Sequence, residues 1–275
     1  MESIADAPRT AILKCPLCGN DMYAVVAHAD RYGFPGRWNY CLGCSFVWLA
    51  DLPAEDAYAK FYNGEYRELT ARFGRKGDIE ENQRRYGRDL AKTIVPHSMG
   101  RARILDVGGG SGIVASEVMK TAMSRGASAP TVHIIEPNVE DAKRAAMLGF
   151  SVVPKPTLDT YDMILVCRTI DHVTDPAALL RSLAAVCHPQ TILYVDHVDF
   201  ESVIEKSLEG GLHVDHPSNF LVETFLGFVA ARGFEVKYMY FPRESSCIGY
   251  VLAYTGARPL RPVRRTSVLR RIVHP

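Results

Sequence analysis

The segment RILDVGGGSG, residues 103–112, constrains the fold more than any other part of this 275-residue chain. Its apolar residues fit a short strand that ends at an acid, Asp106, and four glycines follow in the turn. Residues 113–125, IVASEVMKTAMSR, then have helical spacing. A strand, a glycine turn and a helix in this order begin a doubly wound α/β unit, whose glycines let the backbone approach a ligand.

The acid before the turn indicates which ligand this unit binds. A dinucleotide site needs glycines spaced G-x-G-x-x-G, whereas here Ile113 stands at the last position. A carboxylate at Asp106 would also repel a pyrophosphate but attract an ammonium group, which S-adenosylmethionine carries. The next strand, TVHIIEP, ends in a second acid that suits ribose hydroxyls. We therefore predict a cofactor site formed by Asp106, Gly108, Gly109, Gly110, Gly112, Glu136 and Pro137.

The rest of the chain after residue 101 predicts the same fold. We expect strands at 149–153, 162–167, 190–198, 234–241 and 246–255, and helices at 175–188 and 218–233. Asp175 followed by proline is a typical helix start. The last two strands are close in sequence, so they should pair antiparallel. The predicted fold class is α/β, with a Rossmann-like, mostly parallel sheet that ends in an antiparallel hairpin. Cys167 and Arg168 stand at the end of the fourth strand of this sheet, and we add them to the predicted cofactor site.

Four cysteines near the N-terminus predict a separate metal site. Cys15 and Cys18 form one C-x2-C pair, and Cys41 and Cys44 form another after 22 further residues. Two tight turns of this kind supply the four thiolates of a tetrahedral zinc site, and in a cytosolic chain the spacing favours zinc over disulfides. Four protein ligands leave no open position, so the ion is expected to be structural.

These patterns divide the chain into four predicted parts. A zinc ribbon covers residues 12–50, a helical connector or lid 53–98, the cofactor-binding domain 101–257 and a basic tail 258–275. Tyr62 and Tyr66 are four residues apart in the connector and share a helix face, from which they would close over the active site.

Charge and hydropathy limit the partners. The whole chain has a net charge of +1, and the tail contains six arginines and no acid, which leaves −5 for the remainder. The chain without its tail is mildly acidic, which does not favour binding of a polyanion such as nucleic acid. The arginine-rich tail itself would suit contact with an anionic surface. No apolar run has the roughly 18–20 residues that span a bilayer, and no secretory signal is recognised, so we expect a cytoplasmic protein. The oligomeric state stays open.

Several motifs together resemble a known enzyme family. The segments CPLCG, CLGCSFVW, FYNGEYREL, ILDVGGGSG, IIEP, YDMILVCRTIDHVTDP and VDHPSNF occur in this order between residues 15 and 255. The set resembles bacterial class I S-adenosylmethionine-dependent methyltransferases with an N-terminal zinc ribbon, several of which act on sugars or nucleotide-linked sugars. The resemblance implies methyl transfer to a small-molecule acceptor at oxygen or carbon.

The resemblance also implies acceptor-site residues. In such enzymes a Glu-His pair, with a Phe four residues after the His, lines the acceptor; Asp215, His216 and Phe220 match, with Asp in place of Glu. A motif His-x-x-Glu-His after the fourth strand corresponds to residues 168–172, which begin with Arg and have Asp171 in place of Glu. An acceptor that loses a proton needs a base near neutral pKa, which histidine provides. We expect catalytic roles for His216, Asp215, Tyr66 and His172, and acceptor contacts from Tyr62, Asp196, His197, His213 and Phe220.

Four alternatives stay open. His213 and His216 have spacing that suits a divalent metal, and Asp196, His197 and Asp199 follow the fifth strand where some methyltransferases bind magnesium. An RNA methyltransferase would grip its substrate with the zinc ribbon and the tail, but the acidic body argues against it. A binding module without catalysis would have little need of intact cofactor residues.

Overall fold

The computed structural model describes residues 4–66, 79–97, 103–128, 130–240 and 247–256. Its larger sheet has seven strands in the order β12-β13-β10-β9-β6-β7-β8. Their bounds are β6 Arg103–Val107, β7 Thr131–Ile135, β8 Ser151–Val152, β9 Tyr161–Val166, β10 Cys187–Val198, β12 Phe234–Tyr240 and β13 Cys247–Tyr254. Strands β8, β7, β6, β9 and β10 run parallel, and β13 pairs antiparallel with both β10 and β12. The expected Rossmann-like sheet with a terminal antiparallel hairpin is confirmed.

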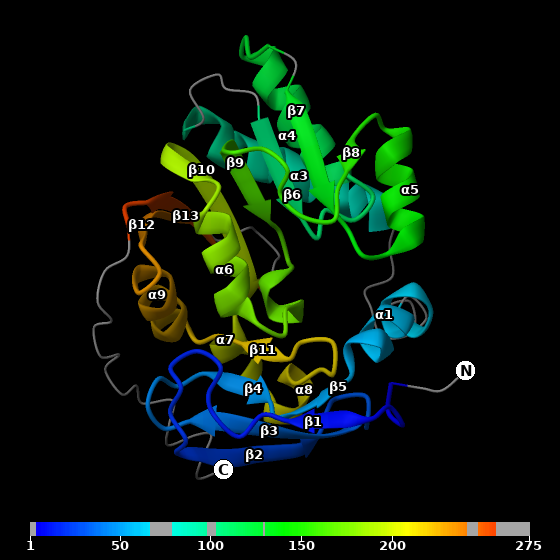
Figure 1. The fold of residues 1–275 in the computed structure, drawn as a ribbon, viewed down its shortest axis with the longest axis vertical. Helices are drawn as coiled ribbons and strands as arrows, with labels where there is room; N and C mark the ends of the chain where they lie inside the picture. Colours follow the sequence, from blue (N-terminus) through cyan, green and yellow to red (C-terminus); the bar gives the residue numbers. More distant parts are fainter. Residues whose placement is uncertain (1–3, 67–78, 98–102, 129, 241–246, 257–275) are drawn as a thin grey trace.

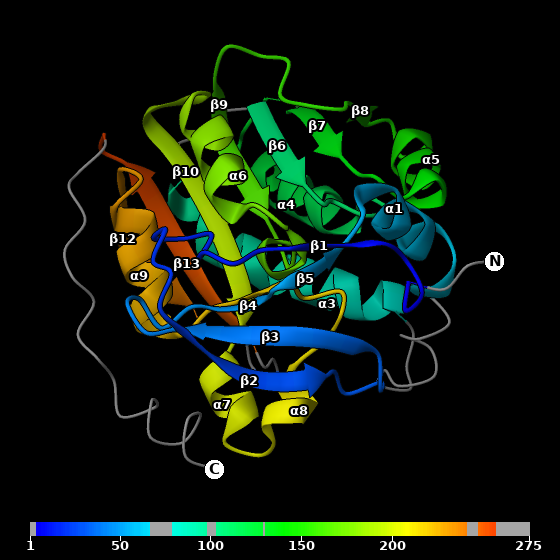
Figure 2. The same cartoon turned by 60° about the horizontal axis from the view of Figure 1, so that its bottom comes forward.

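Helices cover both faces of this sheet (Figures 1 and 2). The helices of the described residues are α1 Glu55–Asn63, α3 Ile79–Ile94, α4 Ile113–Ser124, α5 Val139–Met147, α6 Pro176–Ala184, α7 Phe200–Ile204, α8 Leu208–Gly211 and α9 Val222–Ala230. Along β9, Met163 and Leu165 pack with α3 and α4, whereas Ile164 and Val166 pack with α6 and α9. Because both faces are covered, this central strand is apolar at nearly every position.

A second sheet of four strands lies below the first in Figure 1, in the order β11-β4-β3-β2. Its strands are β2 Tyr23–Ala29, β3 Pro35–Cys41, β4 Val47–Leu49 and β11 Ser218–Asn219, and β1 Arg9–Ala11 pairs separately with β5 Asp51–Pro53. The predicted helix start at Ser218 is wrong, because Ser218 and Asn219 pair with Trp48 and Val47 of β4. Helix α9 begins only at Val222.

The cysteine-containing segment and the large sheet share one hydrophobic core. Phe46 and Trp48 belong to the same buried cluster as Leu105, Val166 and Phe225. Phe220 lies at the junction: its ring centroid is 5.0 Å from that of Phe46 and 5.4 Å from that of Phe225. Residues 67–78 of the predicted connector and the predicted tail 258–275 lie outside the described residues.

Truncation of Phe220 tests this shared core. Phe220 has no exposed surface, so Phe220→Ala should lower the free energy of unfolding by about 3–5 kcal/mol through lost burial and a cavity. Met147→Ala is the control, because Met147 is 86% exposed and its truncation should change stability by no more than about 0.5 kcal/mol. Urea denaturation measures both, and equal midpoints for the two variants would contradict the shared core.

Candidate active site

The glycine turn between β6 and α4 leaves an open space at the carboxyl edge of the sheet. Gly108, Gly110 and Gly112 have φ values of 68°, 55° and 79°, the left-handed region that glycine adopts without strain. A β-carbon on Gly109 would lie 2.8 Å from the carboxyl carbon of Asp106, whereas one on Gly110 would meet no atom within 4 Å. The backbone at Gly110 therefore borders space that a ligand can occupy.

Asp106 is a buried carboxylate below this turn. It has no exposed surface, and both its oxygens are without a hydrogen-bond partner among the described residues. Burial, and to a smaller extent the nearby charge of Glu136, raises the pKa of Asp106 from 3.8 to about 7. A buried acceptor with no donor is costly, so the site favours a ligand that brings a positive donor to this carboxylate.

Glu136 ties the glycine turn to the end of β7. Its Oε2 accepts a hydrogen bond from the backbone N–H of Gly110 at 2.8 Å, and its Oε1 accepts one from the backbone N–H of Asn138 at 2.7 Å. Pro137 between them is exposed. The carboxylate of Glu136 is thus held in a fixed orientation beside the glycine turn.

Arg168 and Cys167 follow β9 beside this turn. Arg168 has φ 49°, and its backbone N–H donates to Asp196 Oδ1 at 2.5 Å. The other oxygen of Asp196 accepts from Tyr86 Oη at 2.6 Å, and the Arg168 guanidinium lies 4.8 Å from the centre of the Tyr86 ring. Burial raises the pKa of the Cys167 thiol well above its usual value, so it is present as a neutral group.

Asp196 has no exposed surface. Its carboxylate accepts from the Arg168 backbone and from Tyr86 of α3, so it holds these two elements together. Tyr86 itself escaped the sequence analysis, because only the folded chain brings α3 over the strand ends.

His197 and Phe220 also lie inside the core, contrary to the expected acceptor contacts. Neither has exposed surface. The imidazole of His197 lies 2.7 Å from the carbonyl oxygen of Val198 through Nδ1 and 3.2 Å from Tyr250 Oη through Nε2. Its ring also packs against Phe220 and Phe225. These contacts occupy both ring nitrogens of His197. Among the described residues, the alternative magnesium group of Asp196, His197 and Asp199 does not bring its ligand atoms together.

Three other predicted residues do come together. His172, Asp215 and His216 each offer a ligand atom, and these atoms all lie within 4.8 Å of one another. The rings of His172 and His216 are 4.4 Å apart in an edge-to-face arrangement. His213 stacks on His216 with ring centroids 4.7 Å apart, and its Nε2 lies 3.4 Å from Arg31 Nη1. Burial lowers the pKa of His172, lowers that of His216 well below 6.5 and lowers that of His213 to about 3, so all three are neutral at physiological pH.

Tyr62 of α1 connects this histidine group to the cofactor side. Its hydroxyl lies 3.0 Å from His172 Nδ1 and donates to the carbonyl oxygen of Asp215 at 3.2 Å. Its own carbonyl oxygen accepts from Asn138 Nδ2 at 2.7 Å, next to Glu136. Tyr66 packs edge-on against His172, with ring centroids 6.2 Å apart. Tyr62 and Tyr66 thus both lie against His172, and their closure over an active site stays a prediction. Asn138 is an additional contact that the sequence analysis missed.

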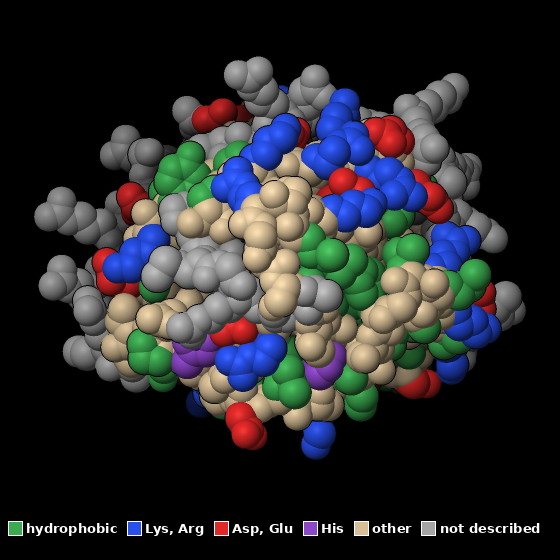
Figure 3. Space-filling view, turned by 90° about the horizontal axis from the view of Figure 1, so that it is seen from above, with side chains coloured by type: hydrophobic (Ala, Val, Ile, Leu, Met, Phe, Trp, Pro, Cys, Tyr) green, Lys and Arg blue, Asp and Glu red, His purple; other side chains and the backbone are tan. Residues whose placement is uncertain are grey.

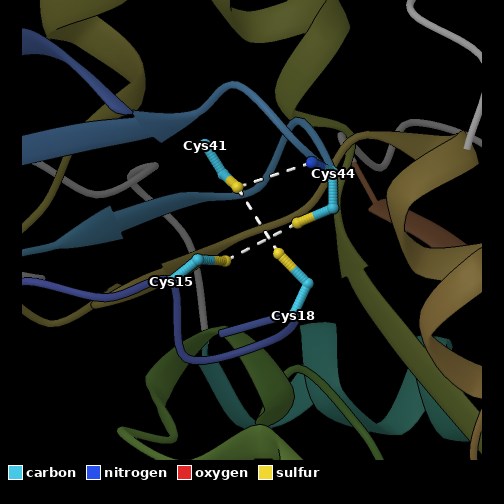
Figure 4. Close-up of side chains that lie close together, drawn as sticks. All are labelled: Cys15, Cys18, Cys41 and Cys44. Carbon is cyan, nitrogen blue, oxygen red and sulfur yellow. Dashed lines mark hydrogen bonds between the residues drawn. The ribbon is translucent and has the colours of Figure 1, made fainter. Parts of the chain in front are cut away.

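The side chains of the four cysteines point toward one another (Figure 4). Cys15 Sγ lies 3.6 Å from Cys44 Sγ, and Cys18 Sγ lies 3.6 Å from Cys41 Sγ. A tetrahedral site with bonds of about 2.3 Å places its sulfurs about 3.8 Å apart, so the arrangement fits one ion. The backbone N–H of Cys44 points at Cys41 Sγ at 3.4 Å, as expected for a thiolate acceptor.

Comparison with known proteins identifies the class. Residues 58–238, well over half of the chain, match a family described as a methyltransferase domain, so the chain belongs to this methyltransferase family. A search of curated proteins found no match. Within the described ranges, none of the helices combines the length and apolar composition that crossing a bilayer requires.

Solved structures support the same fold. The plantazolicin methyltransferase BpumL, in complex with a triazolic desmethylPZN analog and SAH, is 14% identical with a TM-score of 0.54, covering 72% of this chain and 95% of its own. Magnesium protoporphyrin IX methyltransferase ChlM from Synechocystis PCC 6803, with bound SAH, is 13% identical with a TM-score of 0.52, covering 74% and 100%. At these identities the likeness concerns the class I methyltransferase fold alone.

The pH dependence of stability tests the burial of Asp106. Between about pH 4 and 7 the unfolded chain releases the Asp106 proton while the folded chain retains it. Stability therefore falls as pH rises through this window, by at most about 1.4 kcal/mol per pH unit, and the loss stops above about pH 7. Asp106→Asn cannot ionise, so its stability relative to the parent chain should rise between pH 5 and pH 8. The exposed Asp159→Asn is the control; the same relative stability of Asp106→Asn at both pH values in urea denaturation would contradict this prediction.

Proposed function

We propose that this chain transfers a methyl group from S-adenosylmethionine to a small-molecule acceptor, with a sugar or nucleotide-linked sugar as the acceptor class. The observation that carries the cofactor is Asp106, whose two buried oxygens have no hydrogen-bond partner among the described residues. An ammonium group would donate hydrogen bonds to that carboxylate and neutralise its charge, whereas a pyrophosphate would repel it. The open space at Gly110 and the oriented carboxylate of Glu136 suit the remainder of the cofactor.

The demand on the protein in such a reaction is mainly positional. S-adenosylmethionine, when bound, supplies a methyl group on a sulfonium whose leaving group is already good. The chain therefore has to hold the acceptor in line with that methyl group and keep water away. Asp106 and Glu136 would hold the cofactor, while Tyr62 spans the distance to His172 and Asp215 on the acceptor side.

A hydroxyl acceptor, or a carbon beside a ketone, must also lose a proton. Our candidate for the base is His216, acting as a free imidazole. It is neutral, and its Nε2 lies 3.7 Å from the carboxylate of Asp215. His172 and Tyr62 would orient the acceptor, and Tyr66 would cover it. Support for a sugar acceptor comes from the resemblance of the VDHPSNF segment and from the polar character of this group.

Surface charge agrees with a small acceptor. In the face shown in Figure 3, basic side chains gather toward the upper edge, and acidic side chains lie among them. A polyanion held along the protein would need a basic surface without such interruptions.

Calorimetric titration with S-adenosylmethionine tests the cofactor. We expect binding to the parent chain and a loss of at least tenfold in affinity for Asp106→Asn, which leaves the ammonium without its partner charge. Because binding uses ionised Asp106, affinity should fall about tenfold per pH unit below about pH 7, where an α-amino group stays protonated. Asp159→Asn is the matched control and should bind like the parent, whereas absence of binding to the zinc-loaded parent would reject the proposed function.

We further propose that Cys15, Cys18, Cys41 and Cys44 hold a structural zinc ion. Cys15 and Cys41 are buried in the core that the two sheets share, so loss of the ion would expose thiolates inside that core. With four protein ligands the site has no open position for an acceptor.

Substitution of one cysteine tests the zinc site. Cys44→Ser should lose one equivalent of zinc and lower the Tm by about 10 °C, which corresponds to a few kcal/mol for a chain of this size. Cys187→Ser removes a thiol outside the group and should keep the metal. Elemental analysis with thermal denaturation measures both quantities; an unchanged zinc content in Cys44→Ser would contradict the proposal.

A further inference from the structure

The group of His172, Asp215 and His216 is assembled from two loops that the fold holds in place. His172 belongs to a short 3-10 helix, Ile170–His172, after β9, and the other two precede β11. The second loop is fixed at Val214, whose N–H donates to Asp30 Oδ2 at 2.9 Å and whose carbonyl oxygen accepts from Tyr58 Oη at 2.9 Å. The side chains are therefore presented by rigid backbone.

Asp215 is a buried carboxylate surrounded by imidazoles that do not hydrogen-bond to it. It is 5% exposed, and its Oδ1 has no hydrogen-bond partner among the described residues. His216 Nε2 and His172 Nδ1 lie 3.7 Å and 3.9 Å from its Oδ2, and His213 Nδ1 lies 3.7 Å from its Oδ1. An ion pair between a charged imidazole and a carboxylate would close to about 2.7–2.9 Å. These separations are therefore too long for a network in which the imidazoles simply donate hydrogen bonds to Asp215.

The same separations suit atoms that share a metal ion. Bonds of about 2.0–2.2 Å from nitrogen and carboxylate oxygen place neighbouring ligand atoms about 3.0–3.6 Å apart. The two distances from Asp215 Oδ2 need only a small closure to reach this range. Tyr62 Oη, which now lies 3.0 Å from His172 Nδ1, can release that nitrogen because the carbonyl oxygen of Asp215 is a second acceptor at 3.2 Å.

We propose that His172, Asp215 and His216 bind a divalent first-row transition ion. Two imidazoles and one carboxylate are ligands of the type that zinc and ferrous iron prefer, and three protein ligands leave coordination positions open. The four cysteines form a closed site, so the chain would carry two ions of different character. His213 is not a ligand in this proposal, because its Nε2 faces the guanidinium of Arg31.

This inference rests on the proposed function and deepens it on the acceptor side. An open position beside the cofactor turn would take an oxygen of the acceptor, so the acceptor would be one that presents a hydroxyl or an enol oxygen to the ion. The ion would lower the pKa of the bound hydroxyl or enol, so that its proton could leave to solvent. In the chain without this ion, His216 would accept that proton instead. The loop of His172 also contains Thr169, against which a β-carbon at Gly108 would collide, so the group adjoins the glycine turn.

Cobalt substitution distinguishes the two sites in the intact chain. Co²⁺ bound by four thiolates gives an intense sulfur-to-metal charge-transfer band, whereas Co²⁺ bound by imidazole and carboxylate gives only weaker visible bands. We expect the parent chain, stripped of metal and titrated with Co²⁺, to bind two equivalents. His216→Ala and His172→Ala should each bind one equivalent and keep the charge-transfer band.

The charge-transfer band also reports folding, because the loop of Asp215 continues into β11 of the sheet that contains the cysteines. His213→Ala is the matched control: it removes a neighbouring imidazole from the same carboxylate and should still bind two equivalents. A parent chain that binds one equivalent, or a second equivalent that persists in both His216→Ala and His172→Ala, would overturn the metal site. Calorimetry with S-adenosylmethionine on the same samples separates that result from failure of the proposed function.

Discussion

The antiparallel pairing of Ser218 and Asn219 with β4 is the contact on which the arrangement of the site depends. It makes a segment from the middle of the methyltransferase part the fourth strand of the cysteine-containing sheet. Further contacts reinforce it: Leu49 N–H donates to the carbonyl oxygen of Pro217, and Thr224 Oγ1 donates to that of Cys44. The residues just before the strand, Asp215 and His216, are thereby held between the two sheets.

This attachment explains why the cysteine-containing segment is more than an appendage. Without β4, Ser218 and Asn219 would lose their strand partner, and the loop of Asp215 and His216 would lose one of the contacts that hold it. A metal ion in the four cysteines would thus stabilise β3 and β4, and through them the loop of Asp215 and His216. It would do so without contacting the acceptor. A closed tetrathiolate site suits such a role, because an ion with no open position stabilises the backbone around it without competing for ligands.

Local patterns in the sequence predict the sheet and the cofactor turn well. Strand, glycine turn and helix occupy consecutive residues, and the positive φ angles at Gly108, Gly110 and Gly112 are a local requirement of that turn. The four cysteines were equally predictable, because two short spacings define their geometry. Two-residue strands such as β11 are different: Ser218 and Asn219 have no strand pattern of their own, and their conformation comes from β4.

For the residues that we expected near the acceptor, the sequence predicted only part of the placement. Asp215, His216, His172 and Tyr62 meet as expected, although they lie far apart in the chain. His197 and Phe220 instead lie in the core, where they pack against each other and against Phe225. Tyr86 was invisible for a further reason: a tyrosine on an amphipathic helix signals packing, and its bond to Asp196 exists only after α3 docks.

Asp106 and Asp215 present the same physical problem twice. Each is a carboxylate with almost no exposed surface and with at least one oxygen that lacks a hydrogen-bond partner among the described residues. Leaving such a group uncompensated is costly, and a folded chain retains it where a bound cation repays the desolvation. At Asp106 the surroundings are glycine backbone and another acid, which suits an organic ammonium that brings its own hydrogen-bond donors. At Asp215 the surroundings are imidazole nitrogens with lone pairs to share, and that environment suits a metal ion.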